Sequence, residues 1–269
     1  MLKLDIHTDG IARLTLERPA LHNAFNAELI IALTEAFDRL IDAETTVRVL
    51  VITGQGRSFS AGADLGWMQS MSHASELDNR ADAKRLAAMF RSLDQLPIPT
   101  IARVNGSAFG GGVGLIACCD MAVASSQALF GLTEVRLGLI PATIAPFVIN
   151  RIGISASRRL LLTGEKFTAQ QARRYGLISE CVEADQLDQV VDTLIQSLLA
   201  GGPQAIDQCK QLIRRIHHFD GSQRELDAMT AEWIARLRVS DEGQHGLRSF
   251  LNKQQPKWMT EAPQTHPDE

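Results

Sequence analysis

The fold is decided by a run of small residues, Ala108-Phe109-Gly110-Gly111-Gly112-Val113-Gly114. Residues 100–104 before it are typical of a strand, and residues 113–119 after it of a helix. Three successive glycines at such a junction need a reason, because glycine loses more backbone entropy on folding than any other residue. They let a ligand approach backbone N–H groups at a helix N-terminus, where the helix dipole favours negative charge. The run therefore predicts either an oxyanion hole or a tight turn under close helix–sheet packing.

A second loop of small residues, Phe59-Ser60-Ala61-Gly62-Ala63-Asp64, follows a predicted buried strand at residues 47–52. Such a loop can present an unobstructed amide, here that of Ala63. Two amides from separate loops can bind one developing oxyanion, and the loss of one donor typically costs on the order of 10²–10³ in rate. For Asp64 the residue type favours a helix cap over a catalytic role.

Glu134 is the titratable candidate in a third segment, residues 130–141. It follows a short predicted strand and is flanked by apolar residues. A position in a pocket would raise its pKa, as suits a general acid or base. Spacing alone favours the alternative of a salt bridge with Arg136 on a solvated loop. A dinucleotide site with Glu134 on the ribose is disfavoured, because the glycine spacing is not G-x-G-x-x-G.

Strands and helices alternate on both sides of these loops. Alternating apolar residues at 2–6 and 12–16 flank Asp9-Gly10 and predict an antiparallel hairpin. Asn26 is a predicted helix N-cap, and residues 81–93 have the period of a further helix. The order strand, strand, helix then repeats. It predicts an α/β fold in which a sheet winds into a spiral with helices outside, not a TIM barrel.

The pattern changes after Gly164, where helices dominate. Thr168 and Gln171 form a capping-box pattern at the start of a short helix. From residue 186 onward, three apolar stripes carry more apolar surface than a short appendage can bury, which predicts a segment that packs between subunits. The chain is thus expected to have three parts: a core at residues 1–195, a helical C-terminal segment at 196–262 and a flexible tail at 263–269.

Composition disfavours several classes of partner. The chain has 269 residues and a formal net charge of -4, so no global basic character indicates nucleic acid or an anionic membrane. No apolar stretch is long enough to span a bilayer, and the N-terminus lacks the apolar block of a signal peptide. The four cysteines and the histidines complete no zinc pattern. We therefore expect a cytoplasmic protein with reduced cysteines and no metal.

These motifs together resemble the enoyl-CoA hydratase/isomerase (crotonase) superfamily over nearly the full length of the chain. Each motif is weak by itself, but all of them in this order are hard to obtain by chance. They are Glu17-Arg18-Pro19, Asn23-Ala24, Ser60-Ala61-Gly62-Ala63-Asp64, Asn105-Gly106, Gly110-Gly111-Gly112, Cys119-Asp120 and Leu162-Thr163-Gly164. The resemblance implies a crotonase-like α/β spiral that acts on an acyl-CoA.

The resemblance also implies roles for particular residues. The amides of Ala63 and Gly111 would form the oxyanion hole for the thioester oxygen, and Glu134 would be the family's second catalytic glutamate. Coenzyme A enters only as part of the substrate, and no other cofactor is implied. Contacts with it are implied for Ala61, Asp64, Leu65, Phe250 and Lys253. Relatives often supply the last two from a neighbouring subunit and form trimers or hexamers, so we expect a homotrimer or homohexamer joined through the 196–262 segment.

One departure from the family pattern concerns a carboxylate. Two-glutamate hydratases carry their other glutamate two residues after the glycine triplet, where this chain has Gly114. Glu134 then has to activate water and protonate the α-carbon, or share that work with another group. Single-glutamate relatives include hydratases, hydratase-lyases and double-bond isomerases. We expect an enoyl-CoA hydratase, with a double-bond isomerase and a non-catalytic acyl-CoA-binding protein as the alternatives.

Residues 112–115 and 132–143 are most similar to a bacterial branch associated with methylglutaconyl-CoA and carboxygeranoyl-CoA hydration. Such substrates carry a carboxylate on the acyl chain, which an arginine would bind. The candidates are Arg136, Arg158 and Arg159, although each is more often a surface ion pair. The predicted substrate is therefore a branched or carboxylated enoyl-CoA.

Overall fold

The structure, a computed structural model, describes residues 1–41 and 46–260 and places their strands in two sheets. The predicted tail at 263–269 lies outside the described residues. The six-stranded sheet has the order β1 (Leu2–Ile6), β2 (Ile11–Leu16), β3 (Val49–Gly54), β5 (Thr100–Val104), β7 (Met121–Ser125), β10 (Glu180–Val182). The four-stranded sheet has the order β4 (Ser58–Ser60), β6 (Ser107–Phe109), β8 (Leu129–Gly131), β9 (Lys166–Thr168).

The chain begins with the predicted antiparallel hairpin. β1 and β2 pair in register from Leu2 opposite Leu16 to Ile6 opposite Ala12. The turn between them uses Asp9, whose Oδ1 accepts a 3.0 Å hydrogen bond from the Ile11 amide. The glycine of the Asp9-Gly10 pair adopts a left-handed φ of 83°, which a residue with a side chain would adopt only with strain. The hairpin prediction is confirmed.

From β3 onward the chain contributes alternately to the two sheets. It adds β4 after β3, β6 after β5 and β8 after β7. β3, β5 and β7 are parallel neighbours in one sheet, and β4, β6 and β8 are parallel neighbours in the other. The predicted spiral of strand, strand and helix is therefore confirmed. As a result, the loops that follow β4, β6 and β8 all leave the same edge of the smaller sheet.

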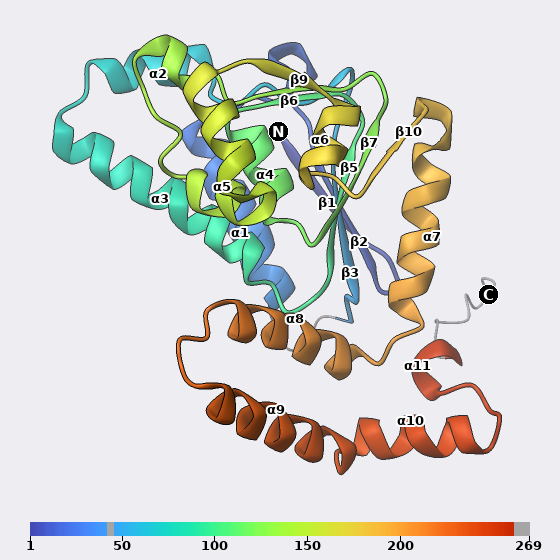
Figure 1. Cartoon of the computed structure of the whole chain (residues 1–269). Helices are drawn as coiled ribbons and strands as arrows, with labels where there is room; N and C mark the ends of the chain where they lie inside the picture. The colour runs from blue at the N-terminus through green and yellow to red at the C-terminus, as the bar shows by residue number, and fades with distance from the viewer. Residues whose placement is uncertain (42–45, 261–269) are drawn as a thin grey trace, which may run out of the picture.

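Helices cover both faces of the six-stranded sheet (Figure 1). α1 (Ala27–Ile41), α3 (Glu76–Asp94) and α4 (Gly111–Cys118) pack on one face, and α7 (Leu187–Leu199) packs on the other. α1 begins at its predicted cap, because Asn26 Oδ1 accepts a 2.9 Å hydrogen bond from the Leu29 amide. The remaining elements of the core are α2 (Leu65–Ser72), α5 (Ala145–Thr163), α6 (Ala169–Tyr175), η1 (Pro19–Leu21), η2 (Glu134–Leu137) and η3 (Ala184–Gln186).

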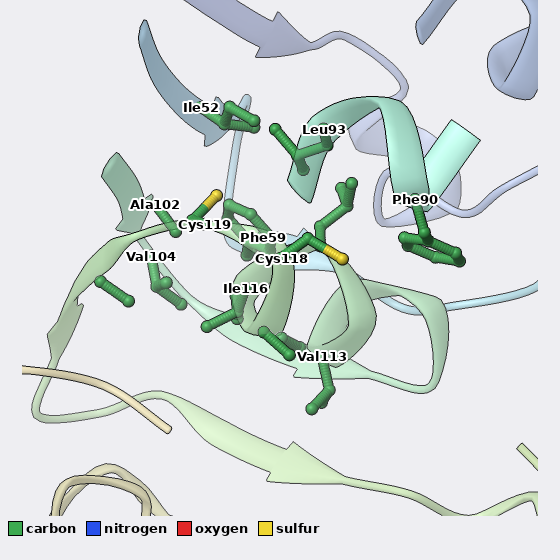
Figure 2. Packing of buried hydrophobic residues seen from close by; sticks show 14 of the residues in the cluster. Ile52, Phe59, Phe90, Leu93, Ala102, Val104, Val113, Ile116, Cys118 and Cys119 are labelled. Carbon is green, nitrogen blue, oxygen red and sulfur yellow. The ribbon is translucent and has the colours of Figure 1, made fainter. Parts of the chain in front are cut away.

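α4 lies inside the core, and its residues from Gly112 to Cys118 are buried. Figure 2 shows Val113 and Ile116 of this helix packed among side chains from the sheet and from α3. Cys118 and the following Cys119 are free thiols in the same apolar cluster, where they act as small hydrophobes. Burial raises the pKa of Cys119 to about 12. The helix that carries the glycine run is thus held in place by the apolar core.

Two predicted boundaries are wrong by a few residues. α3 begins at Glu76 and not at residue 81, because Ser75 caps it and accepts a hydrogen bond from the Asp78 amide at 3.2 Å. Its first turns are polar, so they lie outside the apolar stripe on which the prediction rested. β6 lies within the segment predicted as a glycine loop at 105–112. This three-residue strand is too short to show a period.

The C-terminal helices form a group beneath the core in Figure 1. α7 runs through the predicted boundary at residue 195 and packs on the sheet, and the separate group begins at residue 203. Its members are α8 (Pro203–His217), α9 (Gln223–Arg238), α10 (Asp241–Leu251) and α11 (Lys257–Thr260). Large apolar side chains of this group are exposed, with Ile213 at 69% and Phe250 at 81%. Among the residues described, no helix is long and apolar enough to cross a membrane.

Candidate active site

Three loops meet where β4, β6 and β8 end. The parallel register places Ser60 beside Ala108, and Ala108 beside Phe130. The residues that follow these strands, Ala61–Ala63, Gly110–Gly111 and Thr133–Glu134, therefore emerge side by side, and all of them line one cavity. The structure thus brings together the three segments that the sequence singled out as carriers of chemistry.

Two glycines with left-handed backbones allow the loops to touch. Gly62 has a φ of 86°, and a methyl group on it would lie 2.9 Å from the carbonyl oxygen of Phe109. Gly110 has a φ of 47°, and a methyl group on it would lie 2.9 Å from Glu134 Oε1. A side chain at either position would separate the loops, so the glycines are required by close approach as well as by conformation.

The amides of Ala63 and Gly111 both border this cavity. Gly111 is the first residue of α4, where a backbone N–H has no partner within the helix. Beside Ala63, the Phe25 amide donates to the Gly62 carbonyl at 2.6 Å, and the Asp64 amide donates to the Phe25 carbonyl at 2.8 Å. These two hydrogen bonds to Phe25 use Gly62 and Asp64, the residues on either side of Ala63, and do not involve the N–H group of Ala63. Two amides so placed suit a developing negative charge on a bound oxygen.

Glu134 opens the short η2 helix shortly after β8 and is half-buried. Burial raises the pKa of its carboxyl group above 4.5, and a hydrogen bond to its own backbone amide offsets this only in part. Within the described part of the chain, Glu134 Oε2 is buried without a hydrogen-bond partner. A buried polar atom without a partner is rare in a folded protein and needs an explanation, such as a catalytic role. No ion pair joins it to Arg136 among the described residues, so the salt-bridge alternative is wrong.

The cavity has a volume of about 410 Å³ and mostly apolar walls. Glu134 is the one ionisable side chain among its described lining residues. Trp67, another lining residue, has an indole nitrogen that is buried without a hydrogen-bond partner in the described part of the chain. The apolar walls come from Phe25, Leu65, Met68, Leu86, Phe109, Leu137, Leu139, Ile140, Pro141 and Ile144. In residues 1–41 and 46–260, no cluster of His, Cys, Asp or Glu side chains has the arrangement of a metal site.

Asp64 occupies the cap position that its residue type favours. Its Oδ1 accepts hydrogen bonds from the Gly66 and Trp67 amides at 2.8 and 3.2 Å, at the start of α2. Its Oδ2 lies 3.0 Å from a guanidinium nitrogen of Arg18, and these contacts outweigh burial and lower the pKa of Asp64. Asp64 does not appear among the lining residues, whereas its predicted companions Ala61 and Leu65 do. Asp64 therefore holds the loop in place within this chain.

Phe250 and Lys253 lie elsewhere. Phe250 belongs to α10, and Lys253 follows that helix with a left-handed φ of 57°. In Figure 1, α10 lies beneath the core, at the far end of the molecule from α2, which contributes Leu65, Trp67 and Met68 to the cavity. The structure of one chain therefore does not bring these two predicted coenzyme A contacts to the candidate site.

Gly114, the other position noted in the sequence, is closed off by hydrocarbon. A methyl group on it would overlap Ile144 Cγ2 and would lie 3.0 Å from both Ile144 Cβ and Phe90 Cε1. Neither side chain can move easily, because Ile144 is 2% exposed and Phe90 is fully buried. There is consequently no room for a second carboxylate at this position.

Comparison with known proteins gives the same assignment as the geometry. The family model described as enoyl-CoA hydratase/isomerase matches residues 7–261. The chain belongs to this family. It is 34% identical to 2,3-dehydroadipyl-CoA hydratase of Escherichia coli, over 90% of this chain and 92% of that protein. It is 29% identical to trans-2-decenoyl-[acyl-carrier-protein] isomerase of Streptococcus mutans, over 93% of this chain and 95% of the other.

Solved structures of the family share the crotonase fold of this chain. The crystal structure of an enoyl-CoA hydratase from Shewanella pealeana is 40% identical, with a TM-score of 0.91, and the match covers 96% of this chain and 95% of that one. The fold predicted from the strand, strand, helix repeat is thus confirmed by its neighbours as well as by its topology.

Sequence reasoning missed several residues of the site. Phe25, Trp67 and Ile144 line the cavity, yet each stands in a segment that reads as ordinary core or loop. Arg18 was quoted only as part of a motif, although it binds Asp64 and donates to the Ala24 carbonyl. A local signal existed for Arg18 alone, as part of the Glu17-Arg18-Pro19 motif; the apolar residues carry none.

Proposed function

We propose that this chain adds water across the double bond of an enoyl-CoA. The observation that carries the proposal is Glu134 Oε2, which is buried and has no hydrogen-bond partner among the described residues, in the same cavity as the amides of Ala63 and Gly111. A carboxylate with a raised pKa can accept and return a proton near neutral pH. Two amides can stabilise the enolate that forms in between.

The reaction follows from these three groups. The thioester oxygen of the substrate accepts hydrogen bonds from the Ala63 and Gly111 amides. Glu134 removes a proton from water as the water oxygen bonds to the β-carbon, and the electron pair of the double bond moves toward the thioester oxygen. The enolate then collapses and its α-carbon takes the proton back from Glu134. One water is added, and the carboxylate is restored with no second acid.

For the acyl group we propose a branched hydrocarbon. The cavity walls are apolar, and no cation stands among the described lining residues. Arg136 is exposed, with its side chain beside Gly164, and Arg159 pairs with Glu165. A carboxylated acyl group, the other predicted substrate, would need a counter-ion from outside the described lining residues. The walls therefore support the branched substrate more than the carboxylated one.

For the coenzyme A moiety we propose a site shared between subunits of a homotrimer or homohexamer. Ala61 and Leu65 border the cavity of one chain, and Leu65 is 82% exposed at its mouth. Phe250 and Lys253 do not line that cavity in the same chain, but both are exposed for contact with another. The exposed apolar side chains of the C-terminal helices support assembly through this group. Light scattering of the purified protein tests the subunit number.

The test of the function is turnover of a panel of enoyl-CoAs in water enriched in heavy oxygen. We expect wild type to incorporate the label into a 3-hydroxyacyl product, and Glu134→Gln to lose this activity. Glu76→Gln is a matched control, because Glu76 is an exposed glutamate on α3 outside the cavity. Binding of acyl-CoA without any turnover by wild type would contradict the proposal.

A second candidate function is the isomerisation of a double bond. One observation favours it: Glu134 is the one carboxylate among the described lining residues, and moving a proton between two carbons needs only one. The same panel separates the two reactions. An isomerase shifts the double bond and leaves the heavy oxygen in the solvent, whereas a hydratase incorporates it.

A further inference from the structure

The side chain of Ile144 fills the space that a side chain on residue 114 would occupy. A methyl group added to Gly114 would overlap Ile144 Cγ2. Ile144 is fixed at this point because it precedes α5: its amide donates to the Pro141 carbonyl at 3.2 Å, and its carbonyl accepts from the Phe147 and Val148 amides. Its side chain is 2% exposed in the assembled core and also lines the Glu134 cavity.

The position of Ile144 relative to the reacting groups follows from α4. Gly110 stands against Glu134 Oε1, and the Gly114 amide donates to the Gly110 carbonyl at 3.1 Å, one helical turn further on. A turn rises about 5.4 Å. Ile144 therefore borders the cavity about one turn along α4 from the carboxylate of Glu134. An acyl chain whose thioester oxygen is held by the amide of Gly111 has its alkyl part within reach of this side chain.

We infer that Ile144 determines which acyl chains the site accepts, and that residues 114 and 144 act as a pair that shares one space. The inference rests on the proposed function and deepens it. Residue 114 has no side chain and residue 144 has a branched apolar one, so the cavity is bounded at this point by hydrocarbon. The volume left between Glu134 and Ile144 sets the bulk of the acyl group.

The test compares four proteins: wild type, Ile144→Ala, Gly114→Ala and the double variant. The readout is the ratio of kcat/KM for 2-octenoyl-CoA to kcat/KM for crotonyl-CoA. Ile144→Ala enlarges the cavity, and we expect the ratio to rise by about tenfold or more, as a change of a few methylene groups in an apolar pocket does. Gly114→Ala pushes Ile144 into the cavity and lowers the ratio. In the double variant the added methyl group meets no Ile144 Cγ2 to push into the cavity, so the ratio stays above the wild-type value and close to that of Ile144→Ala.

Ile152→Ala is the matched control, because Ile152 is a buried isoleucine of α5 that does not line the cavity. It removes the same atoms and leaves the ratio unchanged. Ile144→Val, a smaller change, supplies the measurement if Ile144→Ala does not fold. An unchanged ratio in the Ile144 variants, or a double variant that merely sums the two single effects, would overturn the inference.

Binding separates this inference from the proposed function. Calorimetry with saturated butyryl-CoA and octanoyl-CoA measures acyl selectivity without any reaction. A chain-length preference that shifts in Ile144→Ala, in a protein that turns over no enoyl-CoA, would support the role of Ile144 and reject the hydratase. Hydration by wild type with no shift in either assay would support the hydratase and reject the role of Ile144.

Discussion

Glu134 stands directly against the backbone of Gly110, so closely that a methyl group on Gly110 would lie 2.9 Å from Glu134 Oε1. Gly110, the first of the three successive glycines, therefore affects two loops at once. Its left-handed φ of 47° turns the chain into α4, and its missing side chain admits the carboxylate beside the free amide of Gly111. Gly110 contacts the carboxylate of Glu134, and Gly111, the next residue, provides one oxyanion donor at the start of α4. The base and this donor therefore have little freedom to separate.

Glu134→Gln should abolish hydration and stabilise the fold. General acid–base catalysis contributes about 10²–10⁴ in rate, so we expect kcat to fall by at least that factor. The glutamine side chain is neutral, so the cost of burying a charged carboxylate at pH 7 is removed. We expect the free energy of unfolding to rise by about 1 kcal/mol, measured by urea denaturation. A variant that is less stable than wild type would indicate that the carboxylate has a structural partner.

The raised pKa of Glu134 should determine the acid limb of the pH profile of kcat/KM. Only the ionised carboxylate accepts a proton from water, so kcat/KM should fall as the pH drops through that pKa. Because burial raises the pKa, the fall should lie above pH 4.5. An acid limb at or below pH 4.5 would show that Glu134 titrates as an ordinary exposed glutamate and would contradict its assignment as the base.

The free energy of unfolding should also depend on the raised pKa of Glu134, but it should fall, and not rise, as the pH increases. A carboxyl group with a raised pKa in the folded state binds its proton more tightly there than in the unfolded chain. Its contribution is therefore fully present below pH 4.5 and is lost as the pH rises through the folded pKa. The unfolding free energy of Glu134→Gln minus that of wild type should therefore increase as the pH rises from 4.5 through the folded-state pKa. A difference independent of pH would contradict the shift.

The oxyanion role of Gly111 can be tested through its place in α4. Proline is tolerated at the first residue of a helix, and it removes the backbone N–H. Gly111→Pro should lower kcat by about 10²–10³. Gly111→Ala is the control, because it keeps the amide and adds a methyl group at the same place, 3.3 Å from Phe25 Cδ2. Equal losses in the two variants would assign the effect to crowding against Phe25 and not to the missing donor.

Sequence patterns predicted those parts of the fold that depend on local chemistry. The Asp9-Gly10 turn, the Asn26 cap and the capping box of Thr168 and Gln171 are each specified by side chains within a few residues of the backbone groups that they satisfy. α5 was not predicted, because Gly153 interrupts it with a φ of 74° and breaks the helical period. Local rules also miss β4 and β6, whose three residues each are placed by neighbouring strands.

The candidate site was predictable only in its backbone donors. Three successive glycines can be recognised in the sequence as unusual, because their cost in backbone entropy requires a conformational or functional reason. For Glu134, spacing favoured an ion pair with Arg136, but within η2 the Glu134 side chain lies beside Gly110 and the Arg136 side chain lies beside Gly164. Trp67 in α2 and Ile144 at the start of α5 reach the cavity by tertiary packing. Such contacts leave no trace in the period of an isolated segment.

Asp120, in the Cys119-Asp120 motif, joins the C-terminal helices to the core. Its Oδ2 accepts hydrogen bonds from the Thr100 amide at 2.7 Å, the Thr100 hydroxyl at 3.0 Å and Lys210 Nζ at 2.7 Å. Lys210 is the buried residue of α8, at 9% exposure, and burial lowers its pKa in spite of Asp120. The motif thus anchors α8 to the start of β5, at the end of α4 opposite to Gly111.

Asp120→Asn should therefore destabilise the protein by about 2–4 kcal/mol, because it leaves a buried ammonium group without its counter-ion. Adding Lys210→Met should recover much of that loss, since the pair is then replaced by neutral groups. Urea denaturation at one fixed protein concentration measures both. Glu76→Gln, which breaks the exposed Arg80–Glu76 pair, should cost less than about 0.5 kcal/mol and provides the surface reference. If the losses from Asp120→Asn and Lys210→Met simply add, the two residues are not coupled, and α8 is held to the core by its other contacts.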